Sequence, residues 1–147
     1  MACCNKNITI IYMDNSFIDV ANSHIYQLNK NEITMYNGAI IGIIYVKVSS
    51  KKFFSKWSKR YFVLTHNILN LRKPKKHYDK CFLLDDFKLS GITSENRKII
   101  FSIKNKYDNK ILFKFGSINQ TGILEFYDYL CRSLKRIEDK DLLLIYY

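Results

Sequence analysis

Eleven basic residues and a single acidic one lie between Lys47 and Lys80, and the basic residues surround a group of large aromatic side chains. The central stretch reads Lys51-Lys52-Phe53-Phe54-Ser55-Lys56-Trp57. Lys and Arg bind phosphate through charge-assisted hydrogen bonds, and each gains about 1 kcal/mol beside an acidic lipid surface. Burying one Phe adds about 1.5–3 kcal/mol. The run therefore predicts attachment to a negatively charged membrane, and a solvated loop whose rings turn inward is the simpler alternative.

The charge of the chain is unevenly distributed. The 147 residues carry a net charge of +11, but residues 1–37 hold two lysines against three acids. A basic region behind a near-neutral leader predicts an anionic partner, which could be lipid, nucleic acid or an acidic protein. The length suits one domain with its own core.

The cysteines and histidines favour neither a disulfide framework nor a metal site. Cys3 and Cys4 are adjacent, Cys81 and Cys131 lie far apart, and the three histidines fall at no metal-ligand spacing. We expect no metal and no cofactor. No apolar run approaches the roughly 20 residues that span a bilayer, and the first residues lack a secretory pattern, so we expect a cytosolic chain.

The chain also lacks the motifs of common enzymes. It has no Gly-x-Ser-x-Gly and no phosphate-binding glycine loop. Asp85-Asp86 is most simply a turn between strands. We therefore expect a binding module, not an enzyme.

The elements that must position these residues are mostly strands. Apolar and alternating patterns predict seven short antiparallel strands at residues 40–48, 59–65, 68–73, 81–84, 87–92, 98–104 and 110–116. A helix follows, capped by Ser117 or Asn119, with apolar residues at helical spacing from Ile123 to Ile137 and an Asp128–Arg132 pair. The predicted class is mostly β, a seven-stranded barrel or sandwich closed by one C-terminal helix.

Two flanking segments complete the predicted organisation. Residues 1–37 form an N-terminal arm, residues 38–137 the domain and residues 138–147 a C-terminal tail. In the arm, residues 8–13 have β character, and from Asp14 a helical stripe reaches Leu28. That stripe either docks on the domain or is reserved for a partner.

The order of elements and the residues inside it resemble a pleckstrin homology domain, over roughly Gly42 to Leu134. Gly42-Ile43-Ile44-Tyr45-Val46-Lys47 is similar to the family's first strand. Lys56-Trp57-Ser58-Lys59-Arg60-Tyr61-Phe62-Val63-Leu64 resembles the second strand and is the strongest match. Phe126 stands where the family usually has a tryptophan in the closing helix.

The resemblance implies a lipid headgroup pocket between the first two strands. Lys47 and Arg60 match the family's phosphoinositide signature, but Ser58 replaces a basic residue, and the tyrosine common near the end of the third strand is absent. A simpler phosphomonoester such as phosphatidic acid fits better than a polyphosphorylated inositol. The expected headgroup ligands are Lys47, Lys51, Lys52, Lys56, Lys59, Arg60, Arg72 and Lys73. Phe53, Phe54 and Trp57 are the expected wedge in the membrane, although Trp57 could instead pack against the barrel.

The first residues suggest a lipid anchor. Cys3 and Cys4 stand where acylated proteins carry palmitate, and their alternative is ordinary exposed thiols. We hypothesise that Ala2 stands in place of a native glycine, which would give a start resembling a myristoylation signal. An acylated arm before such a domain is similar to the acylated pleckstrin homology proteins of apicomplexan parasites. That resemblance implies a monomer on the cytosolic face of secretory vesicles (micronemes), reading phosphatidic acid during regulated secretion.

Other anionic ligands remain possible from the sequence. Basic and aromatic residues also line grooves for single-stranded nucleic acid, but RNA-binding aromatic pairs and a basic major-groove helix are missing, so we expect no nucleic acid. The same fold could instead bind a phosphoinositide, a soluble inositol phosphate or a protein.

Overall fold

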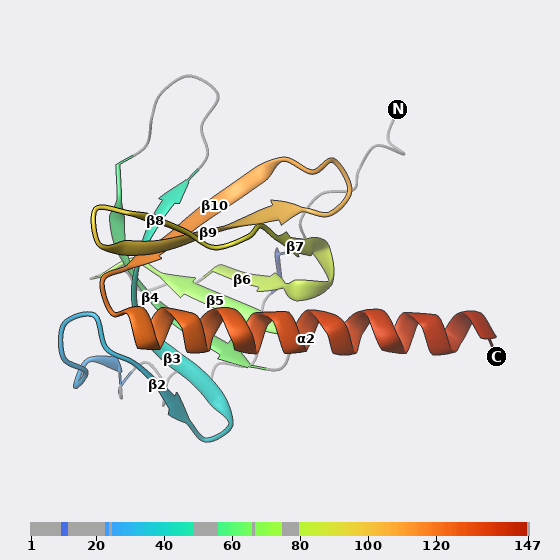
Figure 1. The fold of residues 1–147 in the computed structure, drawn as a ribbon. Coiled ribbons are helices and arrows are strands. Elements are labelled where there is room, and N and C mark those ends of the chain that lie inside the picture. The colour runs from blue at the N-terminus through green and yellow to red at the C-terminus, as the bar shows by residue number, and fades with distance from the viewer. Residues whose placement is uncertain are drawn as a thin grey trace.

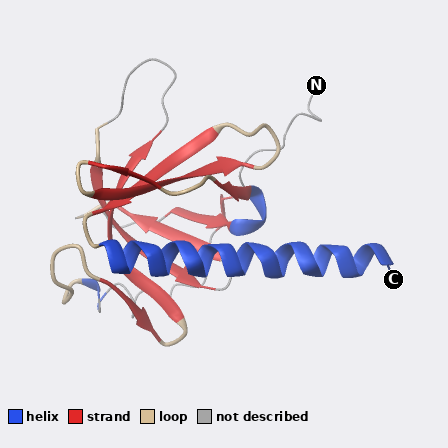
Figure 2. Cartoon of the chain, viewed as in Figure 1, coloured by secondary structure: helices blue, strands red, loops and turns tan. Residues whose placement is uncertain are grey.

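The computed structural model describes residues 10–11, 23, 25–48, 56–65, 67–74 and 80–146 of the chain. Within these residues, antiparallel strands form one sheet that curls into a half-barrel, and one long C-terminal helix packs across it (Figure 1, Figure 2). The protein is therefore mostly β with a closing helix, as the sequence predicts. This architecture is compatible with a pleckstrin homology-like fold.

Within the described part of the chain, the sheet contains ten strands. They are β1 (Ile10–Ile11), β2 (Ile33–Tyr36), β3 (Ala39–Val48), β4 (Ser58–Thr65), β5 (Ile68–Arg72), β6 (Lys80–Leu83), β7 (Phe87–Leu89), β8 (Thr93–Glu95), β9 (Lys98–Asn105) and β10 (Ile111–Ser117). Their order is β1-β6-β5-β4-β3-β10-β9-β7, with β2 on β3 and β8 on β9. A short 3₁₀ helix, η2 (Leu84–Asp86), joins β6 to β7.

One face of the curled sheet forms the main core. The alternation predicted for β9 is confirmed, because Phe101 and Ile103 are buried in this core, and Phe115 of β10 is buried with them. For the start of β10 the prediction is wrong, because a register irregularity there leaves Ile111 exposed and packs Leu112 against the core. Ile40, Ile44 and Val46 of β3 point into the same cluster, whereas Ala39, Ile41 and Ile43 join a second cluster on the other face. Even-numbered residues of β3 therefore face the barrel interior, which decides where its polar residues point.

The closing helix α2 (Gln120–Tyr146) begins after Asn119. The side-chain Oδ1 of Asn119 accepts a hydrogen bond from the Gly122 amide at 3.0 Å, so Asn119 is the N-cap. Phe126 is 0% exposed and stacks on Phe62 with 4.4 Å between ring centroids. Phe126 thus closes the core with an apolar ring from the C-terminal helix.

Part of the predicted arm packs on the domain. Ile25 is 1% exposed and lies in the second cluster with Leu28 against it. These two residues of the predicted stripe dock on the outer face of the sheet. The preceding residues 12–22 lie outside the described part of the chain.

The sequence prediction of seven strands misses two strands that the structure shows. β2 falls in the predicted arm, and it exists because it pairs with the Ala39–Gly42 half of β3. β8 is exposed throughout and so shows no hydrophobic alternation. β1 has two residues and lies within residues 8–13 of the arm, for which the sequence predicts β character. The helix also continues through the predicted tail to Tyr146, because no glycine or proline follows Ile137 to stop it.

Among the described residues, no helix has both the length and the apolar character needed to cross a lipid bilayer.

Candidate functional site

A cavity opens at the end of the barrel where β3 finishes and β6 begins. Its volume is about 210 Å³. We call it the mouth cavity, and it is lined by Val46, Val48, Arg60, Leu71, Lys73, Lys80, Phe82 and Phe113. Val46, Leu71, Phe82 and Phe113 form its floor on the main core. Val48 is exposed at its edge, and Arg60, Lys73 and Lys80 supply its charge.

The mouth cavity is positively charged. None of the described residues that line it is Asp or Glu. Arg60 is half-buried, and its Nη1 donates to the carbonyl of Lys59 at 2.8 Å. Burial lowers the pKa of Arg60 from its ordinary value, but a guanidinium keeps its charge at neutral pH. Three cations over an apolar floor can hold one phosphate-bearing group through charge-assisted hydrogen bonds.

Strand register places Lys47 and Arg60 on opposite faces of the sheet. Ile44 pairs with Arg60, and Val46 pairs with Ser58, and both β3 residues face the barrel interior. Arg60 therefore faces inward, whereas Lys47, one residue beyond Val46, faces outward. The structure brings Arg60 and Lys73 together at the mouth but does not bring Lys47 to them.

Lys47 belongs instead to an outer cluster around Trp57. The Trp57 ring lies where a Cβ on Gly116 would meet it at 3.2 Å, so the ring packs against the β10 backbone at Gly116 and is half-buried. The Nζ of Lys98 lies 4.8 Å from its centroid and that of Lys47 5.6 Å. Lys47, Trp57 and Lys114 also line a cavity of about 410 Å³. The described lining residues of this cavity include one acid, Glu95. We call Lys47, Trp57, Lys98 and Lys114 the outer cluster.

Two further predicted ligands, Arg72 and Lys59, lie neither in the mouth cavity nor in the outer cluster. The Arg72 guanidinium lies 4.9 Å from the Tyr26 ring and 5.7 Å from the Tyr61 ring. Lys59 lies 5.6 Å from the Tyr61 ring. Both residues face outward over β4 and β5 and do not line the mouth cavity.

The rest of the predicted site lies at or beyond the edge of the described residues. Lys56 is exposed two residues before β4. The remaining predicted ligands, wedge residues and acylation sites lie outside the described part of the chain: Ala2, Cys3, Cys4, Lys51, Lys52, Phe53 and Phe54.

Sequence reasoning missed three cations that the structure brings to these sites. Lys80 starts β6 and lines the mouth cavity, and its position two residues before the inward-facing Phe82 is a signal the sequence contained. Lys98 and Lys114 reach Trp57 only because β10 pairs with both β3 and β9. No local pattern could have joined them.

Among the described residues, no group of three or more His, Cys, Asp or Glu lies close enough to hold a metal ion. No model of a known protein family matches the chain, and no curated protein is significantly similar to it in sequence. The fold and the site geometry therefore carry the functional argument.

Proposed function

We propose that this chain is a pleckstrin homology-like, non-enzymatic module that binds acidic phospholipid at a membrane surface through the mouth cavity. The observation that carries the proposal is the composition of that cavity, with Arg60, Lys73 and Lys80 over an apolar floor and no acid among its described lining residues. Phosphate pairs with the cations, and the apolar floor suits the start of the acyl chains.

The size of the cavity supports phosphatidic acid as the preferred lipid. Its volume of about 210 Å³ lies below the roughly 300–1,000 Å³ typical of sites for drug-sized ligands. A lone phosphomonoester is compact, whereas a bisphosphorylated inositol ring is much larger. The replacement of a basic residue by Ser58 on β4 also removes one inward-facing cation that an inositol phosphate would use.

The outer cluster adds electrostatic attraction to the membrane, although its residues do not line the mouth cavity. Lys47 and Lys114 pair across β3 and β10 on the other face of the sheet, near the same end of β3, and Lys98 lies beside them over the Tyr45 and Trp57 rings. A headgroup layer that reaches both faces gains about 1 kcal/mol for each nearby cation. Because Trp57 is packed on Gly116, we assign it to the outer cluster, and we propose Phe53 and Phe54 as the residues that enter the acyl region.

The resemblance to acylated pleckstrin homology proteins of apicomplexan parasites supplies the cellular setting. One acyl chain gives only marginal membrane binding, with an association constant on the order of 10⁴ M⁻¹, so stable attachment needs a second signal. Acylation at the start of the chain and phosphatidic acid at the mouth would provide these two signals. We propose a monomer on the cytosolic face of secretory vesicles (micronemes) that acts in regulated secretion.

Co-sedimentation with vesicles of equal negative charge tests the proposed ligand. The vesicles contain phosphatidic acid, phosphatidylserine or a phosphoinositide bisphosphate in neutral lipid. We expect the largest bound fraction with phosphatidic acid, because its terminal phosphomonoester fits the small cavity. Stronger binding to the bisphosphate would instead support inositide recognition. Equal binding to all three lipids would mean that the mouth cavity attracts negative charge without selecting a headgroup.

A further inference from the structure

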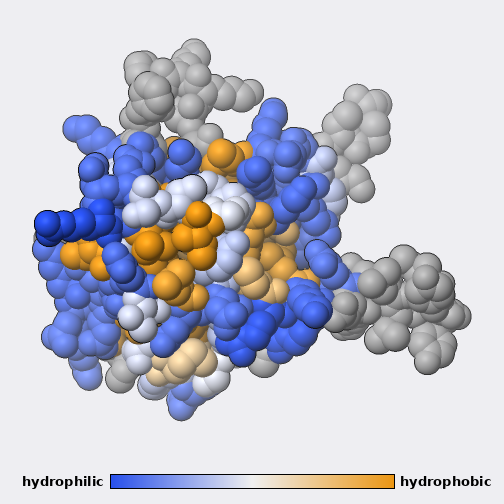
Figure 3. All heavy atoms as spheres, in the orientation of Figure 1, coloured by the Kyte–Doolittle hydropathy of each residue, from blue (hydrophilic) through white to orange (hydrophobic). Residues whose placement is uncertain are grey.

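A further cationic hollow lies between the β2–β3 turn and α2. Its volume is about 560 Å³, and we call it the helix groove. Its lining residues are Met35, Gly38, Tyr129, Arg132, Ser133, Lys135 and Arg136, with three cations and no acid among them. Hydrophilic residues gather along the side of α2 that faces the turn (Figure 3).

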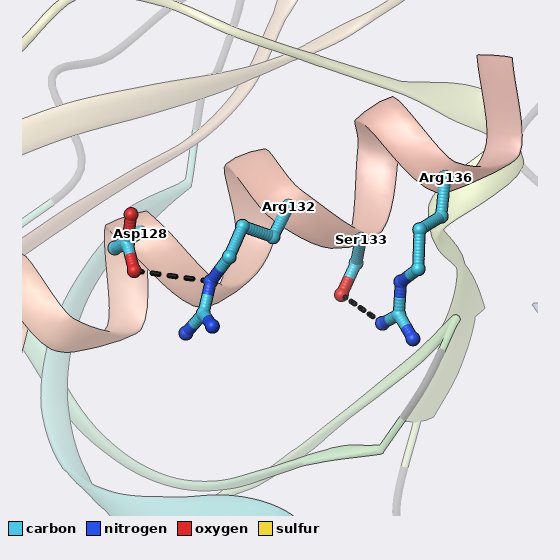
Figure 4. A network of polar contacts seen from close by, with 4 residues as sticks. All are labelled: Asp128, Arg132, Ser133 and Arg136. Atoms are coloured by element: carbon cyan, nitrogen blue, oxygen red, sulfur yellow. Dashed lines mark hydrogen bonds and ion pairs between the residues drawn. The ribbon is translucent and has the colours of Figure 1, made fainter. Parts of the chain in front are cut away.

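Two guanidinium groups in this groove contact side chains of their own helix (Figure 4). The Nε of Arg132 pairs with Oδ2 of Asp128 at 3.1 Å. The Nη2 of Arg136 donates to the Ser133 hydroxyl at 3.2 Å, and Ser133 is only 1% exposed. A guanidinium has five N–H donors, so each of these contacts leaves donors for an external anion. Four residues apart, the two groups lie on one side of the helix.

The wall opposite the helix is fixed. The Tyr129 hydroxyl donates to the Gly38 carbonyl at 3.0 Å, which ties the β2–β3 turn to α2. Gly38 has a φ of +82°, a conformation that glycine adopts without strain. Met35 is 53% exposed beside it and offers an apolar contact. The groove thus combines three cations with the exposed Met35 thioether, beside a turn that is hydrogen-bonded to the helix.

The groove lies at the end of the domain opposite the mouth. It adjoins the Ala39 end of β3, whereas the mouth cavity adjoins the Val48 end (Figure 1). A ten-residue strand spans about 30 Å at about 3.3 Å per residue. A bilayer bound at the mouth cavity therefore leaves the helix groove in solution. The anion that binds in the groove is then not a lipid headgroup of that bilayer.

We propose that the helix groove binds an acidic segment of a protein partner. Carboxylates of that segment pair with Arg132 and Arg136, and an apolar neighbour contacts Met35. Charge complementarity favours an acidic chain, and nucleic acid is less suited because the one aromatic ring among the lining residues, Tyr129, is committed to Gly38. The domain would then hold an acidic protein at a membrane.

Methyl NMR of methionine tests this proposal, because the chain has three methionines and Met35 is the one that lies among the described residues, where it lines the groove. The probe is a short acetylated peptide in which Glu and Leu alternate, and its control has Gln in place of Glu. We expect the Glu-containing peptide to shift the Met35 methyl signal until the shift saturates. We expect the Gln control peptide to leave that signal unchanged. Arg132→Gln with Arg136→Gln should weaken binding by about tenfold or more, because two charge-assisted contacts are lost.

The matched variant is Lys88→Gln with Lys110→Gln, which removes the same charge from exposed positions outside the groove. Its affinity should equal that of the parent chain, and the amide spectrum of each variant checks its fold. Equal weakening in both variants, or an equal shift with the Gln peptide, would overturn the proposal. So would a single-stranded oligonucleotide that shifts the Met35 methyl at lower concentration than the peptide.

Discussion

Replacing Lys73 and Lys80 by glutamate is expected to abolish binding to vesicles that contain phosphatidic acid. Each substitution removes an attraction of about 1 kcal/mol and adds a repulsion of similar size, so the pair loses about 4 kcal/mol, or several hundredfold in affinity. Both side chains are exposed at the rim of the mouth cavity, so the fold should be unaffected. Vesicle co-sedimentation at fixed ionic strength measures the loss.

The control for this variant makes the same change in charge outside the mouth cavity. Lys30→Glu with Lys135→Glu alters two exposed residues outside the mouth. Its binding should fall much less than that of the mouth variant. An equal fall would show that net charge alone, and not the mouth cavity, drives attachment.

Phe126→Ala is expected to remove much of the stability of the domain. The side chain is fully buried, stacked on Phe62 and in contact with Phe101 and Phe115. Truncating such a ring costs about 3–5 kcal/mol, against a total of about 5–15 kcal/mol for a typical domain. Urea unfolding followed by circular dichroism would show a midpoint shifted far to lower denaturant.

Leu124→Ala on the same helix is the matched control. Leu124 is 43% exposed, so its truncation should change the free energy of unfolding by about 0.5 kcal/mol or less. A small effect for Phe126→Ala, similar to that of Leu124→Ala, would mean that α2 does not close the core as described.

The sequence predicts more of the fold than of the arrangement of residues at the candidate site. Period-two alternation in residues 98–104 and 110–116 follows directly from burial of one sheet face, and the structure keeps Phe101 and Phe115 in the core. The helical spacing around Phe126 is an equally local signal. The strand β2 was missed because its existence depends on pairing with β3 and not on its own four residues.

The site depends on register, which local patterns do not specify. A shift of one residue along a strand moves a side chain to the other face. Lys47 and Arg60 look like partners in the sequence, yet the Ile44–Arg60 pairing sends them to opposite faces. Lys80 reaches the mouth because β6 pairs with β5, and Lys98 reaches Trp57 because β9 lies beyond β10.

The most direct test of phosphatidic acid binding at the mouth is an NMR titration of the arginine Nε–H signals with short-chain phosphatidic acid. Arg60 is the described arginine that lines the mouth cavity, whereas Arg132 and Arg136 lie in the helix groove. We predict a saturable shift of the Arg60 signal, with those of Arg132 and Arg136 unchanged. An unchanged Arg60 signal, with shifts confined to the Trp57 indole N–H, would contradict the assignment and move the headgroup to the outer cluster.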